Sequence, residues 1–223
     1  MNNQFFTISE NIFGINSSIL KEYENILFSD EFKINNNLSV LRNENEINKF
    51  VNIKNLLSNI TKFIEKKSKK LIFDDIWIQE STSSSSDKNS VPYIPHIDKI
   101  RKYKIMIYLS DVKNDTGPLH LINIDPNILD DKRKKFSKNY KEKGENIISD
   151  YEIAEYKPCL GNFGTTIFFD TNTPHFAGKV NNNEKKRKIL RFNFRYVDSF
   201  TKNINSLLKG LRITQRNHFF YKH

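Results

Sequence analysis

Two metal-binding residue types stand one residue apart in the stretch PHIDKI, where His96 precedes Asp98. In a β-strand the side chains of residues i and i+2 point to the same side, so this imidazole and this carboxylate face one space. Two histidines and one carboxylate on one face of an ion form the site of non-haem Fe(II) oxygenases and leave other coordination positions open. Such a site here requires one further histidine.

The chain has five histidines, so the candidates for the third ligand are few. His218 and His223 lie in the C-terminal tail and are weak candidates. His120 lies on the next hairpin strand, where it would leave the far wall of the site unfilled. His175 comes directly after the apolar strand TTIFFD and can enter the same space from the opposite side. We therefore expect His175 to be the third ligand.

An arginine follows His175 at the start of the strand KRKILRFNFRY. A buried arginine is costly unless it pairs with a carboxylate, and a bidentate pair is strong and directional. An oxo-acid cosubstrate would supply that carboxylate to Arg187. Arg191 and Arg195 share its strand parity, so periodicity leaves all three arginines open, and position favours Arg187.

In chain order these residues and their neighbours resemble a known family. The pattern H-x-D … IYLSDV … D-x-G-P-L … FFDT … PH-x-A-G-x-V … R is similar to that of the phytanoyl-CoA dioxygenase family, a branch of the Fe(II)/2-oxoglutarate oxygenases. The match covers residues 77–197, and the N-terminal helices fit it only loosely. The segment after the GPL turn, INIDPNILDD, departs from the family pattern.

The resemblance implies a set of site residues and two cofactors. Arg187 would bind the far carboxylate of 2-oxoglutarate, and its other end would chelate Fe(II). Tyr108 falls in the strand where family members often place an aromatic ring beside the cosubstrate. The iron ligands would be His96, Asp98 and His175.

Gln79 lies on the strand before the His-x-Asp motif and is a further candidate to point into the site. With this set complete, we expect hydroxylation of an unactivated C–H bond of a small molecule, with O2 consumed and succinate and CO2 as coproducts. One alternative is a barrel that binds a metal or a small acid without turnover. Another is an oxygenase that acts on protein or nucleic acid, which the net charge of +10 leaves open. Binding to nucleic acid would fall steeply with salt, whereas binding of a small molecule would not.

The order of the elements predicts the fold class. Helical patterns come first, with Ser17 or Ser18 as the N-cap of the first helix, and many short strands with long connections follow. This order favours a mainly β fold with flanking helices, a double-stranded β-helix (a jelly-roll or cupin-like barrel), in one domain over residues 1–223. The helices of residues 16–69 would pack on a barrel of residues 71–198. The expected helices are 16–28 and 44–69, and the expected strands are 71–82, 102–112, 119–124, 164–171, 175–180 and 188–198.

Composition excludes other classes. A single cysteine, Cys159, rules out an internal disulfide and a zinc site with several thiolates, and we expect it to be buried. No signal-peptide pattern and no apolar run of about 20 residues is present, so a cytoplasmic protein without membrane contact is expected. The serine-rich loop 81–90 and the insertion 127–157 are the expected lids, with 130–145 solvated. The tail from residue 199 is expected to form a short helix and an extended end.

Overall fold

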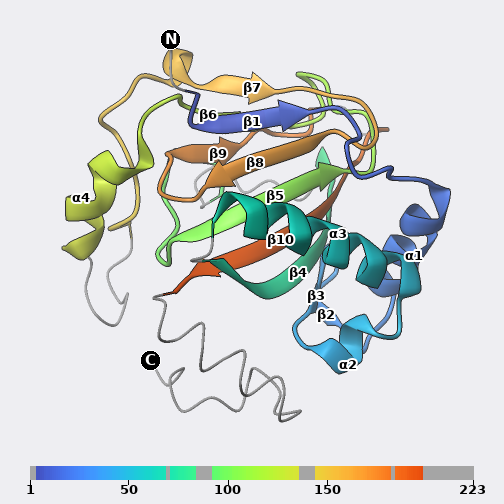
Figure 1. Cartoon of the computed structure of the whole chain (residues 1–223). Helices are drawn as coiled ribbons and strands as arrows, with labels where there is room; N and C mark the ends of the chain where they lie inside the picture. The colour runs from blue at the N-terminus through green and yellow to red at the C-terminus, as the bar shows by residue number, and fades with distance from the viewer. Residues whose placement is uncertain (1–3, 69–70, 84–91, 136–143, 182–183, 198–223) are drawn as a thin grey trace.

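The computed structural model describes residues 4–68, 71–83, 92–135, 144–181 and 184–197. These residues form a layer of helices, a seven-stranded antiparallel sheet and a three-stranded antiparallel sheet (Figure 1). The large sheet has the order β1-β8-β5-β10-β4-β3-β2, and the small sheet has the order β7-β6-β9. The expected jelly-roll architecture with flanking helices is confirmed.

The elements have the following bounds. The strands are β1 (Phe6–Ser9), β2 (Lys33–Asn35), β3 (Leu38–Leu41), β4 (Leu71–Ser81), β5 (Lys102–Tyr108), β6 (Leu119–Leu121), β7 (Lys157–Cys159), β8 (Thr166–Asp170), β9 (His175–Ala177) and β10 (Arg187–Tyr196). The helices are α1 (Ser17–Leu27), α2 (Glu44–Ile47), α3 (Val51–Lys67) and α4 (Asp130–Lys134), with short 3-10 turns at Pro126–Leu129 and Ile153–Glu155. The tail from residue 198 and most of the loop 81–90 lie outside the described residues.

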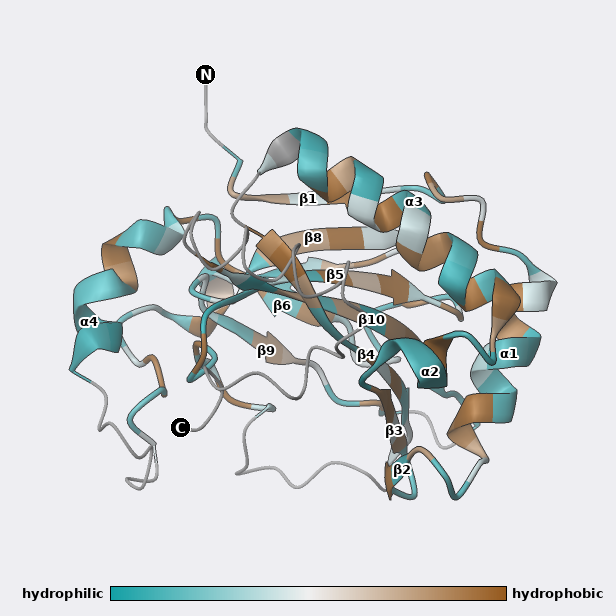
Figure 2. Cartoon of the chain, turned by 60° about the horizontal axis from the view of Figure 1, so that its bottom comes forward, coloured by the Kyte–Doolittle hydropathy of each residue, from teal (hydrophilic) through white to brown (hydrophobic). Residues whose placement is uncertain are grey.

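Alternation along β5 divides the interior into two cores. Ile105 and Ile107 point to the helix side, where α1 and α3 cover the large sheet with apolar residues (Figure 1). Met106 and Tyr108 point to the other side, toward the small sheet. Because successive side chains of a strand face opposite sides, one apolar strand serves both cores. Figure 2 shows the hydrophobic residues concentrated on the strands and α4 as mostly hydrophilic.

The N-cap of the first helix lies earlier in the chain than expected. Asn16, and neither Ser17 nor Ser18, is the N-cap of α1. The Oδ1 atom of Asn16 accepts hydrogen bonds from the backbone N–H groups of Ser18 (3.0 Å) and Ile19 (3.3 Å). Asparagine caps a helix as well as serine does, so the periodic pattern alone could not separate these neighbours.

The expected helix 44–69 is two helices. α2 ends at Ile47, and α3 starts afresh at Val51. The carboxylate of Glu22, on α1, accepts hydrogen bonds from the backbone N–H groups of Asn52 (3.0 Å) and Ile53 (2.9 Å). A carboxylate at a helix N-terminus satisfies amides that lack partners within the helix, and it also interacts favourably with the helix dipole. This long-range contact supports a second helix start that the apolar pattern does not predict.

Tyr108 ties the two sheets together. Its hydroxyl donates to the carbonyl of Cys159 (2.9 Å) and accepts from the backbone N–H of Leu119 (3.2 Å). Tyr108 and Cys159 are fully buried, and burial raises the pKa of the Cys159 thiol to about 12. Cys159 therefore packs as a small apolar residue, as expected. Within the described residues, no helix is both long and apolar enough to cross a membrane.

A glycine makes the close approach that the GP turn requires. Gly117 has φ +74, and a Cβ placed there would lie 2.6 Å from the carbonyl oxygen of Gly178. An L side chain would therefore be strained and would clash with the backbone. The turn that leads into β6 therefore requires glycine at this position.

Candidate metal centre

Three side chains converge between the two sheets. One nitrogen of His96, one oxygen of Asp98 and one nitrogen of His175 all lie within 4.8 Å of one another. In the described part of the chain this is the only group of three or more such residues with the spacing of a metal site. Two imidazoles and one carboxylate match the donor set expected for a non-haem iron site. The structure brings together the three ligands predicted from the sequence.

The two histidines are direct neighbours in the small sheet. The backbone N–H of His96 donates to the carbonyl of His175 (3.0 Å), and that of His175 donates to the carbonyl of His96 (2.9 Å). The segment of His96 thus extends the sheet beyond β9, and the imidazole centroids lie 4.5 Å apart. The expectation that His175 enters from the opposite side was wrong, because the two ligands occupy paired positions on adjacent extended segments.

Backbone carbonyls fix the tautomer of both rings. Nδ1 of His96 lies 2.8 Å from the carbonyl oxygen of Ile94, and Nδ1 of His175 lies 2.8 Å from that of Thr173. A carbonyl only accepts hydrogen bonds, so each Nδ1 carries a proton, and in the neutral form of each ring Nε2 presents a lone pair. These Nε2 atoms lie 3.9 Å and 3.6 Å from Oδ1 of Asp98. The three ligand atoms therefore face one point, and a second set of contacts orients both rings.

The charges at the site suit a cation. Burial, followed by the charge of His175, lowers the pKa of His96 to about 3, so this imidazole is neutral near pH 7. Burial alone would raise the pKa of Asp98, but Lys104 and His175 outweigh it and hold that pKa well below its usual range. Nζ of Lys104 lies 2.5 Å from Oδ2 of Asp98, which leaves Oδ1 toward the histidines. Metal ligands must be deprotonated, and these two are.

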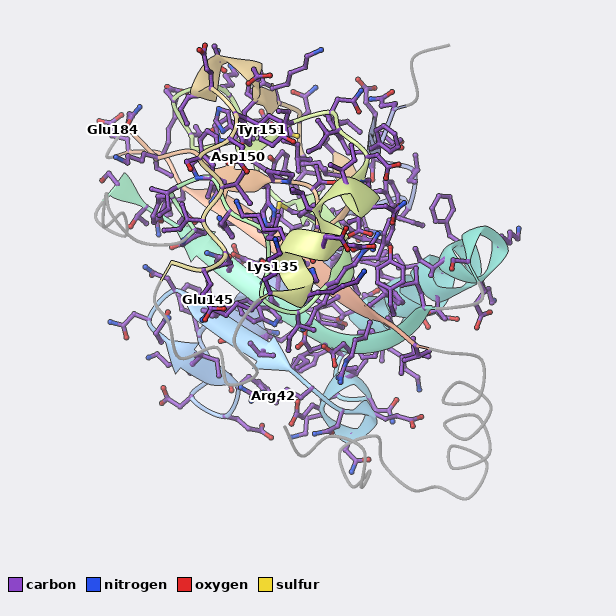
Figure 3. The ribbon with its side chains drawn as sticks, turned by 90° about the vertical axis from the view of Figure 1, so that its left-hand side faces the viewer. Arg42, Lys135, Glu145, Asp150, Tyr151 and Glu184 are labelled. Atoms are coloured by element: carbon purple, nitrogen blue, oxygen red, sulfur yellow. The ribbon has the colours of Figure 1, made fainter. Side chains whose placement is uncertain are left out.

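The insertion after β6 supports the His-x-Asp segment. The backbone N–H of Ile97 donates to the carbonyl of Asn146 (3.0 Å), and that of Ile148 donates to the carbonyl of Pro95 (2.9 Å). The side-chain amide of Asn146 also donates to the carbonyl of Ile97 (2.9 Å). Arg133, in the insertion 130–145 that was expected to be solvated, donates a hydrogen bond to the carbonyl of Lys99 (2.9 Å). The prediction is wrong for this residue. Figure 3 shows the side of the molecule on which α4 lies and labels Glu145, Asp150 and Tyr151 there.

A buried carboxylate connects the segments on either side of the ligands. Asp170, at the end of β8, accepts hydrogen bonds from Arg101 (2.9 Å to Nε) and from the hydroxyl of Tyr196 (2.7 Å). It also accepts the backbone N–H of Asn172 (2.8 Å), in the turn that leads to His175. Arg101 follows Asp98 closely in the chain. This carboxylate thus joins the two ligand-bearing segments, and the sequence pattern did not identify it.

One face of the large sheet carries polar side chains toward the metal centre. On β4 these are Trp77, Gln79 and Ser81, which alternate with residues of the apolar core. On β5, Lys104 shares the parity of Met106 and Tyr108, which face the small sheet. Lys104 was missed in the sequence, where its only signal is a lysine within the apolar run KYKIMIY. On β10 the residues with this orientation are Arg187, Ile189 and Arg191.

The three arginines of β10 have different surroundings. Arg187 is buried, donates to the hydroxyl of Ser81 (3.2 Å) and has an Nε without a hydrogen-bond partner among the described residues. Burial lowers its pKa, while Tyr108 and Tyr93 favour the charged form. Arg195 forms an ion pair with Asp74. The carboxylate that Arg195 needs is thus already supplied by the chain.

His120 lies outside the ligand group. It pairs with Phe176 across β6 and β9, and the two rings are stacked with centroids 4.4 Å apart. Its neighbours Leu119 and Leu121 belong to the core between the sheets, so His120 points away from that core. This agrees with the choice of His175 over His120. His218 and His223 lie outside the described residues.

The comparisons with known proteins give a fold. No protein-family model matches the chain, and no curated protein matches it either. EvdO2 from Micromonospora carbonacea var. aurantiaca matches with a TM-score of 0.57 and 15% sequence identity over 87% of both chains. The carbocyclase SnoK, described as non-haem and α-ketoglutarate-dependent, matches with a TM-score of 0.56 and 12% identity over 86% of this chain and 79% of its own.

The epimerase SnoN, solved with Fe3+, α-ketoglutarate and nogalamycin RO, matches with a TM-score of 0.54 and 11% identity over 87% of this chain and 82% of its own. At such identities the likeness establishes the jelly-roll fold. SnoN and SnoK are described as non-haem, α-ketoglutarate-dependent enzymes. The finer resemblance of this chain to the phytanoyl-CoA dioxygenase family stays a prediction.

Proposed function

We propose that this protein is an Fe(II)- and 2-oxoglutarate-dependent oxidoreductase that acts on a small molecule. The observation that carries the proposal is the convergence of His96, Asp98 and His175 on one point, with the Nδ1 of each histidine held by a backbone carbonyl. This donor set fits Fe(II) and leaves further positions for a chelating oxo acid and O2. Structures with the same fold contain 2-oxoglutarate, which supports the choice of cosubstrate.

We assign the far carboxylate of 2-oxoglutarate to Arg187. This guanidinium is buried, has an Nε without an acceptor among the described residues and lies beside the hydroxyl of Ser81. A carboxylate would satisfy both donors, because guanidinium binds carboxylate through two parallel hydrogen bonds. Arg195 is the weaker candidate because Asp74 already occupies it.

Tyr108 and Gln79 would line the cosubstrate site in different ways. Both hydrogen bonds of the Tyr108 hydroxyl are used within the protein, so Tyr108 offers its ring as a wall. Gln79 lies on β4 with the parity of Trp77 and Ser81, and no described residue forms a hydrogen bond with its side-chain amide. These assignments give Tyr108 a packing role and Gln79 a polar one.

Bound Fe(II), 2-oxoglutarate and O2 together would supply an oxidant for unactivated C–H bonds, with succinate and CO2 as coproducts. The chain itself holds the ligands in place, excludes water and orients the substrate carbon. Hydroxylation is the outcome we propose, by resemblance to the phytanoyl-CoA dioxygenase family. Epimerisation and ring closure are the alternatives that SnoN and SnoK represent.

The test is an anaerobic titration of the purified protein with Fe(II) and 2-oxoglutarate, followed by the visible charge-transfer band of the chelate. We expect a band in the wild type and none in His175→Ala. Arg187→Met should weaken 2-oxoglutarate binding on the order of a hundredfold, because the far carboxylate of the bound cosubstrate would lose its cationic partner. Arg195→Met is the matched control and should keep the wild-type affinity. A folded wild type that gives no band would overturn the proposal and favour a binding module without turnover.

A further inference from the structure

Arg191 is a second cation on the site face of β10, and its side chain is partly buried. Its guanidinium carbon lies 4.2 Å from the centre of the Trp77 ring, which is its cross-strand neighbour. No described residue accepts a hydrogen bond from it, and its Nε is buried. The Nε1 of Trp77 is also buried without a partner among the described residues. Two adjacent groups of donors therefore face the site with their hydrogen-bonding capacity unused.

The two carboxylates whose charges act on Arg191 make their closest contacts with other residues. Asp98 and Asp75 favour its charged form, against a burial that lowers its pKa. Asp98, however, forms an ion pair with Lys104 and belongs to the metal centre. Asp75 accepts a hydrogen bond from Asn193. Neither makes an ion pair with Arg191, so this guanidinium lacks an oxyanion of its own.

Charge balance also leaves Arg191 uncompensated in the loaded site. A divalent ion and the two carboxylates of 2-oxoglutarate cancel one another, and the pair of Lys104 and Asp98 is neutral. Arg187 and Arg191 then remain as two positive charges on one strand face. A charge that is shielded from water without a partner is costly, so a bound anion would stabilise the loaded site.

The cosubstrate cannot serve both arginines through one carboxylate. Residues four apart on a strand are separated by roughly 13 Å, from a rise of about 3.3 Å per residue. With Arg187 assigned to the far carboxylate, Arg191 is available for another molecule. Arg191 pairs with Met106 on β5, two residues from Lys104, whose ammonium contacts the candidate ligand Asp98, so Arg191 lies toward the metal end of the site.

We propose that the substrate carries an oxyanion, a carboxylate or a phosphate, which binds the Arg191 guanidinium where it stacks on Trp77. This inference rests on the proposed function and adds the substrate class: an anionic small molecule. The indole supports the guanidinium plane and leaves its edge donors for the oxyanion. The Nε1 of Trp77 supplies a further donor beside it.

The chain contains one tryptophan, so Trp77 reports on its own site. The protein loaded with Zn(II) and saturating 2-oxoglutarate is titrated with benzoate, phenyl phosphate and inorganic phosphate, and tryptophan emission is recorded under excitation that spares tyrosine. Benzamide is the uncharged counterpart of benzoate. We expect a saturable change with an anion and none with benzamide. The tighter of benzoate and phenyl phosphate identifies the oxyanion.

Three variants separate the explanations. Arg191→Met should weaken the anion at least about tenfold, the loss of one charge-assisted contact, while the Fe(II)–2-oxoglutarate band persists. Arg191→Lys keeps the charge and should give an intermediate affinity. Arg195→Met is the matched control and should bind as the wild type does.

Two results would overturn the inference while the proposed function stands. One is an intact band in the wild type with no saturable response to any anion, or with a response that Arg191→Met leaves unchanged. The other is loss of the band in Arg191→Met, which would make Arg191 the cosubstrate anchor. Absence of the band from the wild type would instead remove the proposed function itself.

Discussion

On the helix side of the large sheet, β10 contributes Leu190 and Phe192, which are fully buried in an apolar core. On the opposite side, the same strand contributes Arg187 and Arg191, which carry donors without acceptors among the described residues. The two faces differ because the side chains of the first pack against other parts of the chain, whereas the arginines of the second retain donors that a ligand could use. Packing on the first face therefore stabilises a strand whose second face carries uncompensated charge.

The largest expected effect tests this division with adjacent residues. Phe192→Ala should lower the free energy of unfolding by about 3–5 kcal/mol, because it leaves a cavity in the helix-side core. Arg191→Met should stay within about 1 kcal/mol of the wild type, because the loss of the Trp77 contact is offset by the removal of a partly buried charge. Urea denaturation of the metal-free protein measures both. Equal destabilisation by the two variants would contradict the division of roles between the faces.

The second prediction concerns the buried carboxylate that joins the ligand segments. Asp170→Ala should lower the free energy of unfolding by about 2–4 kcal/mol, because Arg101 and Tyr196 lose a shared acceptor. It should also weaken Mn(II) binding, measured by the EPR signal of the free ion, since the turn before His175 loosens. Asp115→Ala, which breaks the exposed pair with Lys185, is the matched control and should leave both quantities near the wild type. Unchanged Mn(II) affinity in Asp170→Ala would show that the carboxylate serves stability alone.

The smallest effect is a dependence on pH at the edge of the charged face. Burial would raise the pKa of Asp74, but Lys102 (2.6 Å) and Arg195 outweigh it and lower that pKa. The stability from this group is complete above its unfolded pKa of about 4 and is lost as pH falls through the lower folded pKa. Thermal midpoints of the wild type and Asp74→Asn should therefore converge as pH falls from neutral to acidic. If the difference between the two thermal midpoints stayed constant over that range, the substitution would act through packing and not through the charge of Asp74.

The convergence of the three candidate ligands could be predicted from the sequence because the patterns that contain them are local. The His-x-Asp spacing fixes two side chains on one side of an extended segment, and the apolar strand before His175 places the third at a strand start. The fold class followed in the same way from the order of helical and strand patterns. Each pattern used in these predictions spans only a few neighbouring residues, although the patterns are spread along the chain.

The remaining features depend on contacts between distant segments. The break between α2 and α3 involves Glu22, and the pairing of His96 with His175 is a matter of register. The sequence correctly predicted that the three arginines share one face of the strand, but it could not predict which residues each of them contacts. A bulge between Asn193 and Phe194 in the pairing with β4 accompanies the contact that engages Arg195 with Asp74. No local pattern encodes such a partner.

The segment around Asn146 has a consequence for engineering. In many barrels a surface loop can be exchanged to alter specificity while the scaffold keeps its chemistry. Here Asn146 and Ile148 form hydrogen bonds with the backbone on either side of His96, and Ile148 packs on the buried Ile97. Grafting a foreign loop in place of residues 144–150 would therefore also disturb the segment that carries His96 and Asp98. In this protein the loop and the candidate metal centre would have to be redesigned as one unit.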